Sequence, residues 1–187
     1  GITLIEDNQN IPNWNKLEHI IESQDNIIID YGVDGKGDLF NPLNYNHLKE
    51  NYSGTMDLIT ADGGFDFSIN FNHQESQALR LLLTEVIYTF MLQKNGGVFI
   101  FKVFDTFKKS SIDILYLLSC FYENITVVKP NTSRYANSEK YVVCKNFNYE
   151  HKNLQELNQK LYNILFVINK MEGPIYGYDE VFLRNAL

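Results

Sequence analysis

Apolar residues along this chain form two alternating patterns, short unbroken runs and longer stretches with helical spacing. The short runs are rich in Ile, Val and Phe and are bounded by Gly, Asn, Asp or Ser, a pattern typical of strands. They predict strands at residues 26–31, 58–61, 98–104, 125–129 and 139–145, and residues 1–4 could end a further strand. The run at 98–104 is apolar except for Lys102, so we expect both of its faces to be buried.

The longer stretches carry apolar residues three and four positions apart, which predicts helices. These helices are expected at residues 14–21, 42–52, 72–94, 110–122 and 154–171, followed by a surface tail at 172–187. The third is the longest, and Gly96 with Gly97 is expected to end it.

The alternation of strands and helices indicates a mostly parallel sheet with helices on both faces. The last two predicted strands are joined by a loop too short for a crossover helix, so one of them must run antiparallel. This arrangement is the outline of the sheet in S-adenosylmethionine-dependent methyltransferases.

Composition narrows the class of protein. With 187 residues, 44% of them hydrophobic, the chain fits one globular domain. A net charge of −7 argues against broad, sequence-blind binding of nucleic acid and leaves a local basic patch open. Cys120 and Cys144 fall in helix and strand patterns and are expected to be reduced, which favours an intracellular protein. The sequence has no apolar run long enough to span a membrane and no histidine spacing typical of a metal site. We therefore expect neither a membrane nor a metal ion as a partner.

Charged residues stand at the ends of three predicted strands. Asp62 follows the strand at 58–61 and precedes two glycines, Lys102 lies toward the end of the next strand, and Glu139 begins the last. All three can meet at one edge of the sheet, where open α/β sheets bind their ligands. A structural ion pair explains each residue alone, and Asp62 could also be a solvated residue at a strand exit. Together, beside glycine loops, they indicate a catalytic group.

Three motifs carry a resemblance to a known family. ADGGF at 61–65, FKVFD at 101–105 and KPNTSRYANSEKYVVCK at 129–145 resemble FtsJ-type ribose 2'-O-methyltransferases, most closely the branch that acts on mRNA caps. The loop GVDGKGDLFNPLN at 32–44 is similar to the family's GDGD-type loop. The resemblance implies a Rossmann-like methyltransferase fold for a single domain 1–187, with a core at 1–145 and a C-terminal helix and tail at 146–187.

By this resemblance Asp62, Lys102 and Glu139 correspond to three members of a Lys-Asp-Lys-Glu tetrad. Lys102 would be the general base that takes the proton of the ribose 2'-hydroxyl, because an alcohol is a poor nucleophile at neutral pH. Asp62 and Glu139 would position Lys102 and balance its charge. The first lysine of the tetrad and the glycine loop for the donor's methionine end lie upstream of a GITL-like segment in the family. We therefore expect the first strand and that loop to be absent from this chain, which begins at Gly1.

The adenosine side of the S-adenosylmethionine site is implied at Asp38, Leu39, Ala61 and Asp62. An acidic side chain and exposed backbone amides suit hydrogen bonding to adenine. Alternatively, Asp38 could cap the helix that begins near Pro42.

Contacts with the RNA substrate are implied at five polar positions, and Lys129 adds local positive charge. A helix start and polar side chains suit phosphate or ribose contacts. As alternatives, Asn72 could be a helix cap and Arg134 a solvated loop residue, and His73 departs from the apolar residue usual in the family. The five positions are Asn72, His73, Gln74, Arg134 and Asn137.

The resemblance implies an enzyme that methylates the first transcribed nucleotide of capped mRNA. The expected partners are capped mRNA and either an N-terminal segment or a larger capping polypeptide. The expected location is the nucleus or the cytoplasm, with the cytoplasm expected for a virus-encoded protein. A ribosomal or transfer RNA ribose methyltransferase and a non-catalytic scaffold that binds RNA or a partner remain as alternatives.

Overall fold

The computed structural model describes residues 1–5, 18–21, 23–64, 74–134, 136–150 and 153–171. Four predicted features lie outside these residues: Asn72, His73, the start of the first predicted helix at 14–17, and the tail at 172–187. The backbone of Gln74 begins a described helix, but its side chain is not among the described parts of the structure.

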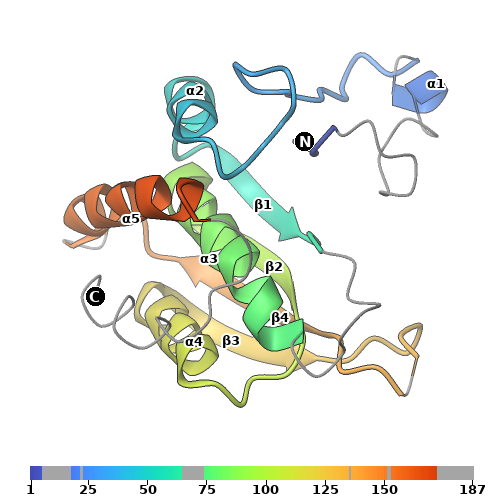
Figure 1. Ribbon diagram of the computed structural model, residues 1–187, viewed down its shortest axis with the longest axis vertical. Helices are drawn as coiled ribbons and strands as arrows, with labels where there is room; N and C mark the ends of the chain where they lie inside the picture. Colours follow the sequence, from blue (N-terminus) through green and yellow to red (C-terminus); the bar gives the residue numbers. More distant parts are fainter. Residues whose placement is uncertain (6–17, 22, 65–73, 135, 151–152, 172–187) are drawn as a thin grey trace.

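Four strands form one mixed sheet (Figure 1). They are β1 Met56–Ala61, β2 Gln93–Val103, β3 Tyr122–Val128 and β4 Lys140–Phe147. Their order is β1-β2-β4-β3, in which β1 and β2 are parallel and β4 runs antiparallel to both of its neighbours. The mixed α/β fold with an antiparallel strand late in the chain is therefore confirmed. The sheet is not mostly parallel among the described strands, since only one of its three pairings is parallel.

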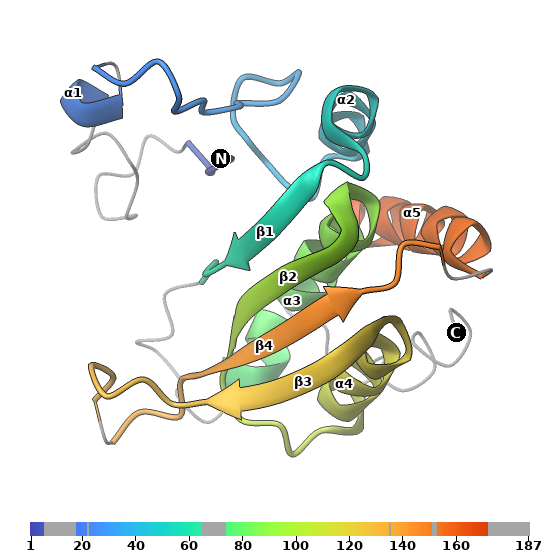
Figure 2. The ribbon, with the colours of Figure 1, turned by 180° about the vertical axis from the view of Figure 1, so that it is seen from behind.

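Five helices are described in this part of the chain. They are α1 Glu18–Ile21, α2 Pro42–Tyr52, α3 Gln74–Leu92, α4 Lys109–Phe121 and α5 Leu154–Asn169. Figure 2 shows that α3, α4 and α5 lie behind the sheet, and that no described helix covers the face toward the viewer. The predicted arrangement, with helices on both faces, therefore differs from the described residues, in which α3, α4 and α5 share one face and leave the other uncovered.

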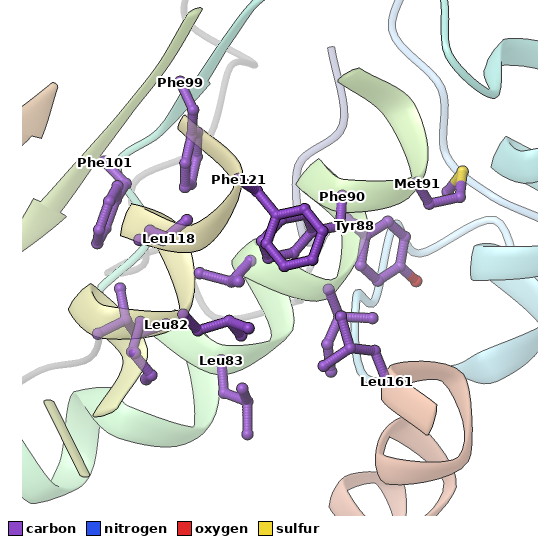
Figure 3. Close-up of a cluster of buried hydrophobic side chains, with 14 of the residues drawn as sticks. Leu82, Leu83, Tyr88, Phe90, Met91, Phe99, Phe101, Leu118, Phe121 and Leu161 are labelled. Carbon is purple, nitrogen blue, oxygen red and sulfur yellow. The ribbon is translucent and has the colours of Figure 1, made fainter. Parts of the chain in front are cut away.

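The core lies between the sheet and α3, α4 and α5 (Figure 3). Phe99 and Phe101 of β2 stack with ring centroids 4.7 Å apart, and Phe90 of α3 meets Phe121 of α4 edge to face at 5.0 Å. Side chains alternate between the two faces of a strand, so Lys102 points away from this core toward the open face. The prediction that β2 is buried on both faces is therefore confirmed for one face only, because Val98, Ile100 and Lys102 on the other face are partly buried.

Two other sequence predictions differ from the structure. The run at 26–31 forms no strand within the described residues. Asp30 makes one isolated bridge to Ile2, and Ile28 is 64% exposed, because β propensity needs a neighbouring strand to act on. Helix α3 ends at Leu92, before the glycines. Gly96, at φ +76°, instead lies in the irregular start of β2, where the register with β1 shifts.

Candidate active site

The parallel pairing of β1 and β2 brings Asp62 and Lys102 together. Ala61 pairs with Phe101, so the next residue on each strand reaches the same edge of the sheet. Asp62 Oδ1 lies 2.7 Å from Lys102 Nζ, which also donates to the Asp62 backbone carbonyl at 3.1 Å. The Lys102 side chain is 14% exposed and that of Asp62 is 65% exposed. The lysine is thus held at two points, with its partner open to solvent.

Strand β4 adds Tyr141, which the sequence analysis did not identify as a site residue. Tyr141 pairs with Lys102 across the β2–β4 ladder, and its hydroxyl donates to Asp62 Oδ1 at 3.2 Å. Burial, together with the nearby carboxylates of Asp62 and Glu139, raises the pKa of Tyr141 to about 12. The phenol therefore keeps its proton at neutral pH and can act as a hydrogen-bond donor.

Glu139 immediately precedes β4, and its charge acts on Tyr141. Its Oε1 accepts a hydrogen bond from Ser133 Oγ at 3.3 Å. The structure thus joins Asp62 and Lys102 in direct contact. Glu139 acts on this group through its charge, which contributes to the raised pKa of Tyr141, while its side chain is bonded to Ser133.

A second residue missed by the sequence analysis, Glu85, lies behind the Asp62 loop. Glu85 is on α3 and is 8% exposed, and its Oε1 accepts a hydrogen bond from the Gly63 backbone N–H at 3.1 Å. Burial raises the pKa of Glu85 to about 7, against the opposing effects of the Gly63 hydrogen bond and Lys102. The signal in the sequence that could have identified Glu85 is a carboxylate within the mostly apolar second half of α3.

Gly63 is required by the space around this site. A Cβ on Gly63 would lie 2.5 Å from Glu85 Oε1 and 2.7 Å from a Leu81 methyl carbon, closer than real Cβ atoms approach. A Cβ on Gly64 would lie 3.5 Å from Lys102 Nζ, which is ordinary van der Waals contact. The site therefore demands a glycine at position 63, whereas the space at position 64 would admit a side chain.

The loop that carries Asp38 is held by a buried asparagine. Asn44 Oδ1 accepts from the Val33 N–H at 2.8 Å, and Asn44 Nδ2 donates to Asp34 Oδ2 and to the Asp38 carbonyl, both at 2.9 Å. Gly37 turns within this loop at φ +66°, where a Cβ would collide with the Thr3 carbonyl. These contacts fix the backbone that carries Asp38.

Asp38 itself closes a turn before α2. Its Oδ1 accepts from the Phe40 N–H at 2.8 Å, whereas the side chain that caps α2 is Asn41, which accepts from the Leu43 N–H at 3.0 Å. The alternative that Asp38 caps this helix is therefore wrong. Leu39 and Ala61 both pack against the edge of the core.

The loop before β4 is organised around Lys129. Lys129 Nζ donates to the Asn137 carbonyl at 2.7 Å, to Asn137 Oδ1 at 3.0 Å and to the Glu139 carbonyl at 3.1 Å. The charge of Lys129 thus stabilises the loop itself. Arg134 is exposed, and its carbonyl accepts from the Asn137 N–H at 3.2 Å.

The described residues show neither a metal-binding group nor a membrane-spanning helix. No group of three or more His, Cys, Asp or Glu residues in this part of the chain is arranged to hold a metal ion. None of the described helices is both long enough and apolar enough to cross a membrane.

Comparison with known proteins matches the chain to one family and its members. The FtsJ-like methyltransferase family matches residues 10–147. The chain is 33% identical over 171 residues to the cap-specific mRNA (nucleoside-2'-O-)-methyltransferase 1 of Mus musculus, covering 87% of this chain and 20% of that protein. It is 42% identical over 119 residues to the methyltransferase 1 of the same name from Trypanosoma cruzi, covering 63% of this chain and 33% of that protein.

A third relative is the cap-specific mRNA (nucleoside-2'-O-)-methyltransferase 2 of Drosophila melanogaster. It is 36% identical over 129 residues, covering 67% of this chain and 18% of that protein. The chain thus spans between 18% and 33% of the length of these three relatives.

Proposed function

This chain belongs to the FtsJ-like methyltransferase family, and from that premise we propose that it transfers a methyl group to the ribose 2'-oxygen of capped mRNA. The observation that carries the proposal is the 2.7 Å pair of Asp62 and Lys102 at the carboxyl end of two parallel strands. Open α/β sheets bind their ligands at such ends. The position of this pair therefore supports a catalytic role for it.

The choice of capped mRNA as substrate is supported by the relatives. The three relatives described above, at 33% to 42% identity, are all named cap-specific mRNA methyltransferases. The first transcribed nucleotide is the proposed target. Such a role places the protein inside a cell, in the nucleus or the cytoplasm.

The chain's own residues supply the proton transfer. A ribose hydroxyl attacks poorly until it loses its proton, and a positioned base accelerates that loss by about 10²- to 10⁴-fold. In the proposed reaction Lys102 acts as the neutral amine, whose Nζ lone pair accepts the ribose proton. The ammonium that this forms is the species that pairs with Asp62 Oδ1, and Tyr141 holds Asp62. Glu139 adds negative charge on the β4 side of the pair.

S-Adenosylmethionine fits the residues at this edge of the sheet and would supply a methyl carbon activated by its sulfonium charge. Asp38 and Leu39 would hold the adenosine, with Ala61 and Asp62 below it. One observation supports the fit. The loop that carries Asp38 is fixed by the buried Asn44.

RNA contacts are proposed at the positions named in the sequence analysis. Asn137 and the exposed Arg134 stand on the loop that leads into Glu139. Because Lys129 ties this loop together, it would present Asn137 and Arg134 on a fixed backbone. Asn72, His73 and Gln74 complete the proposed set.

The test uses the full-length protein, methyl-labelled S-adenosylmethionine and two RNAs of one sequence, with and without a cap. Nuclease digestion then locates the label. We expect label on the 2'-oxygen of the first transcribed nucleotide of the capped RNA. Label on a base, or no transfer at all, would contradict the proposed reaction. Preferential methylation of uncapped ribosomal or transfer RNA would keep the chemistry and overturn the substrate.

A further inference from the structure

Phe107 is the most exposed large apolar side chain among the described residues, at 88%. It belongs to the loop between β2 and α4. Figure 2 shows this loop at the lower edge of the molecule. Water contact with an aromatic ring is unfavourable, so burying the ring against a partner would stabilise that complex. A ring in this position is available to a ligand without any change in the fold.

The backbone beneath this ring is rigidly held. Glu75 on the first turn of α3 accepts hydrogen bonds from the Phe107 N–H at 3.3 Å, the Lys108 N–H at 2.8 Å and the Ser111 hydroxyl at 2.6 Å. One carboxylate thereby joins the loop and the start of α4 to α3. Such pre-organisation lowers the entropy lost when a ligand binds.

The loop starts at the candidate active site. Phe107 follows Lys102 by five residues, so the two Cα atoms are at most about 18 Å apart. Between them, the Phe104 ring lies 5.9 Å from Lys102 Nζ, and Asp105 pairs with Lys140 of β4 at 3.7 Å. A nucleotide chain with its target ribose at Lys102 can therefore reach Phe107 with a neighbouring base.

The charge around the ring suits RNA. Lys108 and Lys109 follow Phe107 directly, in a protein whose net charge is −7. Aromatic rings beside cations bind single-stranded nucleic acid, because the ring stacks on a base while the cations attract the phosphates. A protein partner would need a contiguous apolar patch. Phe107 and Lys108 are instead flanked by the polar residues Thr106 and Lys109, which favours RNA over a protein partner.

We propose that Phe107, with Lys108 and Lys109, is a stacking platform for an unpaired base of the RNA next to the target nucleotide. The platform rests on the proposed function for the choice of RNA. It adds a binding site outside the catalytic group and outside the predicted RNA-binding positions.

The experiment measures binding of the full-length protein to a capped single-stranded RNA with 2-aminopurine beside the target nucleotide. We expect Phe107→Ala to weaken this binding about 5- to 100-fold, as expected for loss of one stacked base. Phe107→Trp should retain the affinity, whereas Phe107→Leu should behave like the alanine variant. In methyl transfer, Phe107→Ala and Phe107→Leu should raise the KM for RNA, whereas Phe107→Trp should keep it.

Tyr116→Ala is the matched control, because Tyr116 is a 67% exposed aromatic residue on α4. It should bind this RNA like the unaltered protein. A fully duplex RNA should bind the Phe107→Ala variant and the unaltered protein equally, since its bases are already stacked.

The outcomes separate this inference from the proposed function. Equal affinity of the Phe107→Ala variant and the unaltered protein for the single strand, with methyl transfer intact, would overturn the platform alone. RNA binding that depends on Phe107 in a protein that never transfers a methyl group would overturn the proposed function and leave the platform standing.

Discussion

Two lysine–aspartate pairs join the same two strands, one at each end of the β1–β2 ladder. Asp57 and Lys94 pair at 2.8 Å where the strands begin, and Asp62 and Lys102 pair at 2.7 Å where they end. The first lysine is 54% exposed and the second is 14% exposed. The residue types and distances match, so the difference between the pairs lies in their surroundings.

The surroundings of the two pairs indicate which of them is suited to a catalytic role. Around Lys102, Tyr141 donates to Asp62, and buried Glu85 holds the adjoining Gly63. The Asp57–Lys94 pair is largely exposed, and exposed pairs contribute about 0–1 kcal/mol to stability. The buried groups around Lys102 thus favour the Asp62–Lys102 pair over the Asp57–Lys94 pair as the proposed catalytic one.

Neutralising one aspartate of each pair should give the largest difference between them. Asp62→Asn removes the charge that holds Lys102, so we expect methyl transfer to slow about 1,000-fold, within the range for a misplaced general base. Asp57→Asn should change the rate less than about twofold and alter stability by less than about 1 kcal/mol, because its pair is exposed. Asp62→Asn should lower stability more than Asp57→Asn, because it leaves a largely buried lysine without its charged partner. Single-turnover methyl transfer and urea unfolding measure the two effects. Equal slowing by both variants would erase the distinction between the pairs.

Glu85 should give the active-site end a pH dependence of stability that the other end lacks. Its folded-state pKa is raised to about 7, so the folded protein binds this proton more tightly than the unfolded chain. The stabilisation is complete below the unfolded pKa of about 4.5 and is lost as the pH rises through 7, a change of about 3 kcal/mol.

The measurement is urea unfolding from pH 5 to pH 8 for the unaltered protein and Glu85→Gln. The free energy of unfolding should fall with rising pH in the unaltered protein relative to the glutamine variant. Glu156→Gln, an exposed change on α5, should follow the unaltered protein. Parallel curves for all three proteins would show that Glu85 does not carry a raised pKa.

Tyr141→Phe should give the smallest effect. It removes one hydrogen bond to Asp62 and keeps the ring, so we expect about a tenfold slower methyl transfer, equivalent to about 1.4 kcal/mol. Tyr149→Phe, a change at an exposed tyrosine, is the control. A rate equal to that of the control would exclude Tyr141 from positioning Asp62.

The sequence was sufficient to predict the contact between Asp62 and Lys102. Both residues follow apolar runs, and the ends of parallel strands meet at one edge of a sheet, so their pairing needed no knowledge of register. Tyr141 was missed because its place opposite Lys102 depends on the register of β4, which the alternation of residues alone does not specify.

Glu85 was missed, and the strand at 26–31 was predicted wrongly, for a related reason. Glu85 contacts Gly63 across 22 residues of chain, and local helical periodicity contains no information about that contact. The β-branched run at 26–31 has strand propensity but makes only one bridge among the described residues. In both cases tertiary neighbours, not local sequence, decide the outcome.

The most direct test of the account compares Lys102→Ala with Lys94→Ala in single-turnover methyl transfer to capped RNA. Each variant removes the lysine of one pair between β1 and β2. The account predicts that Lys102→Ala abolishes measurable transfer while it still folds, and that Lys94→Ala transfers at the rate of the unaltered protein. Retained transfer in Lys102→Ala would contradict the assignment of this end of the sheet as the catalytic site.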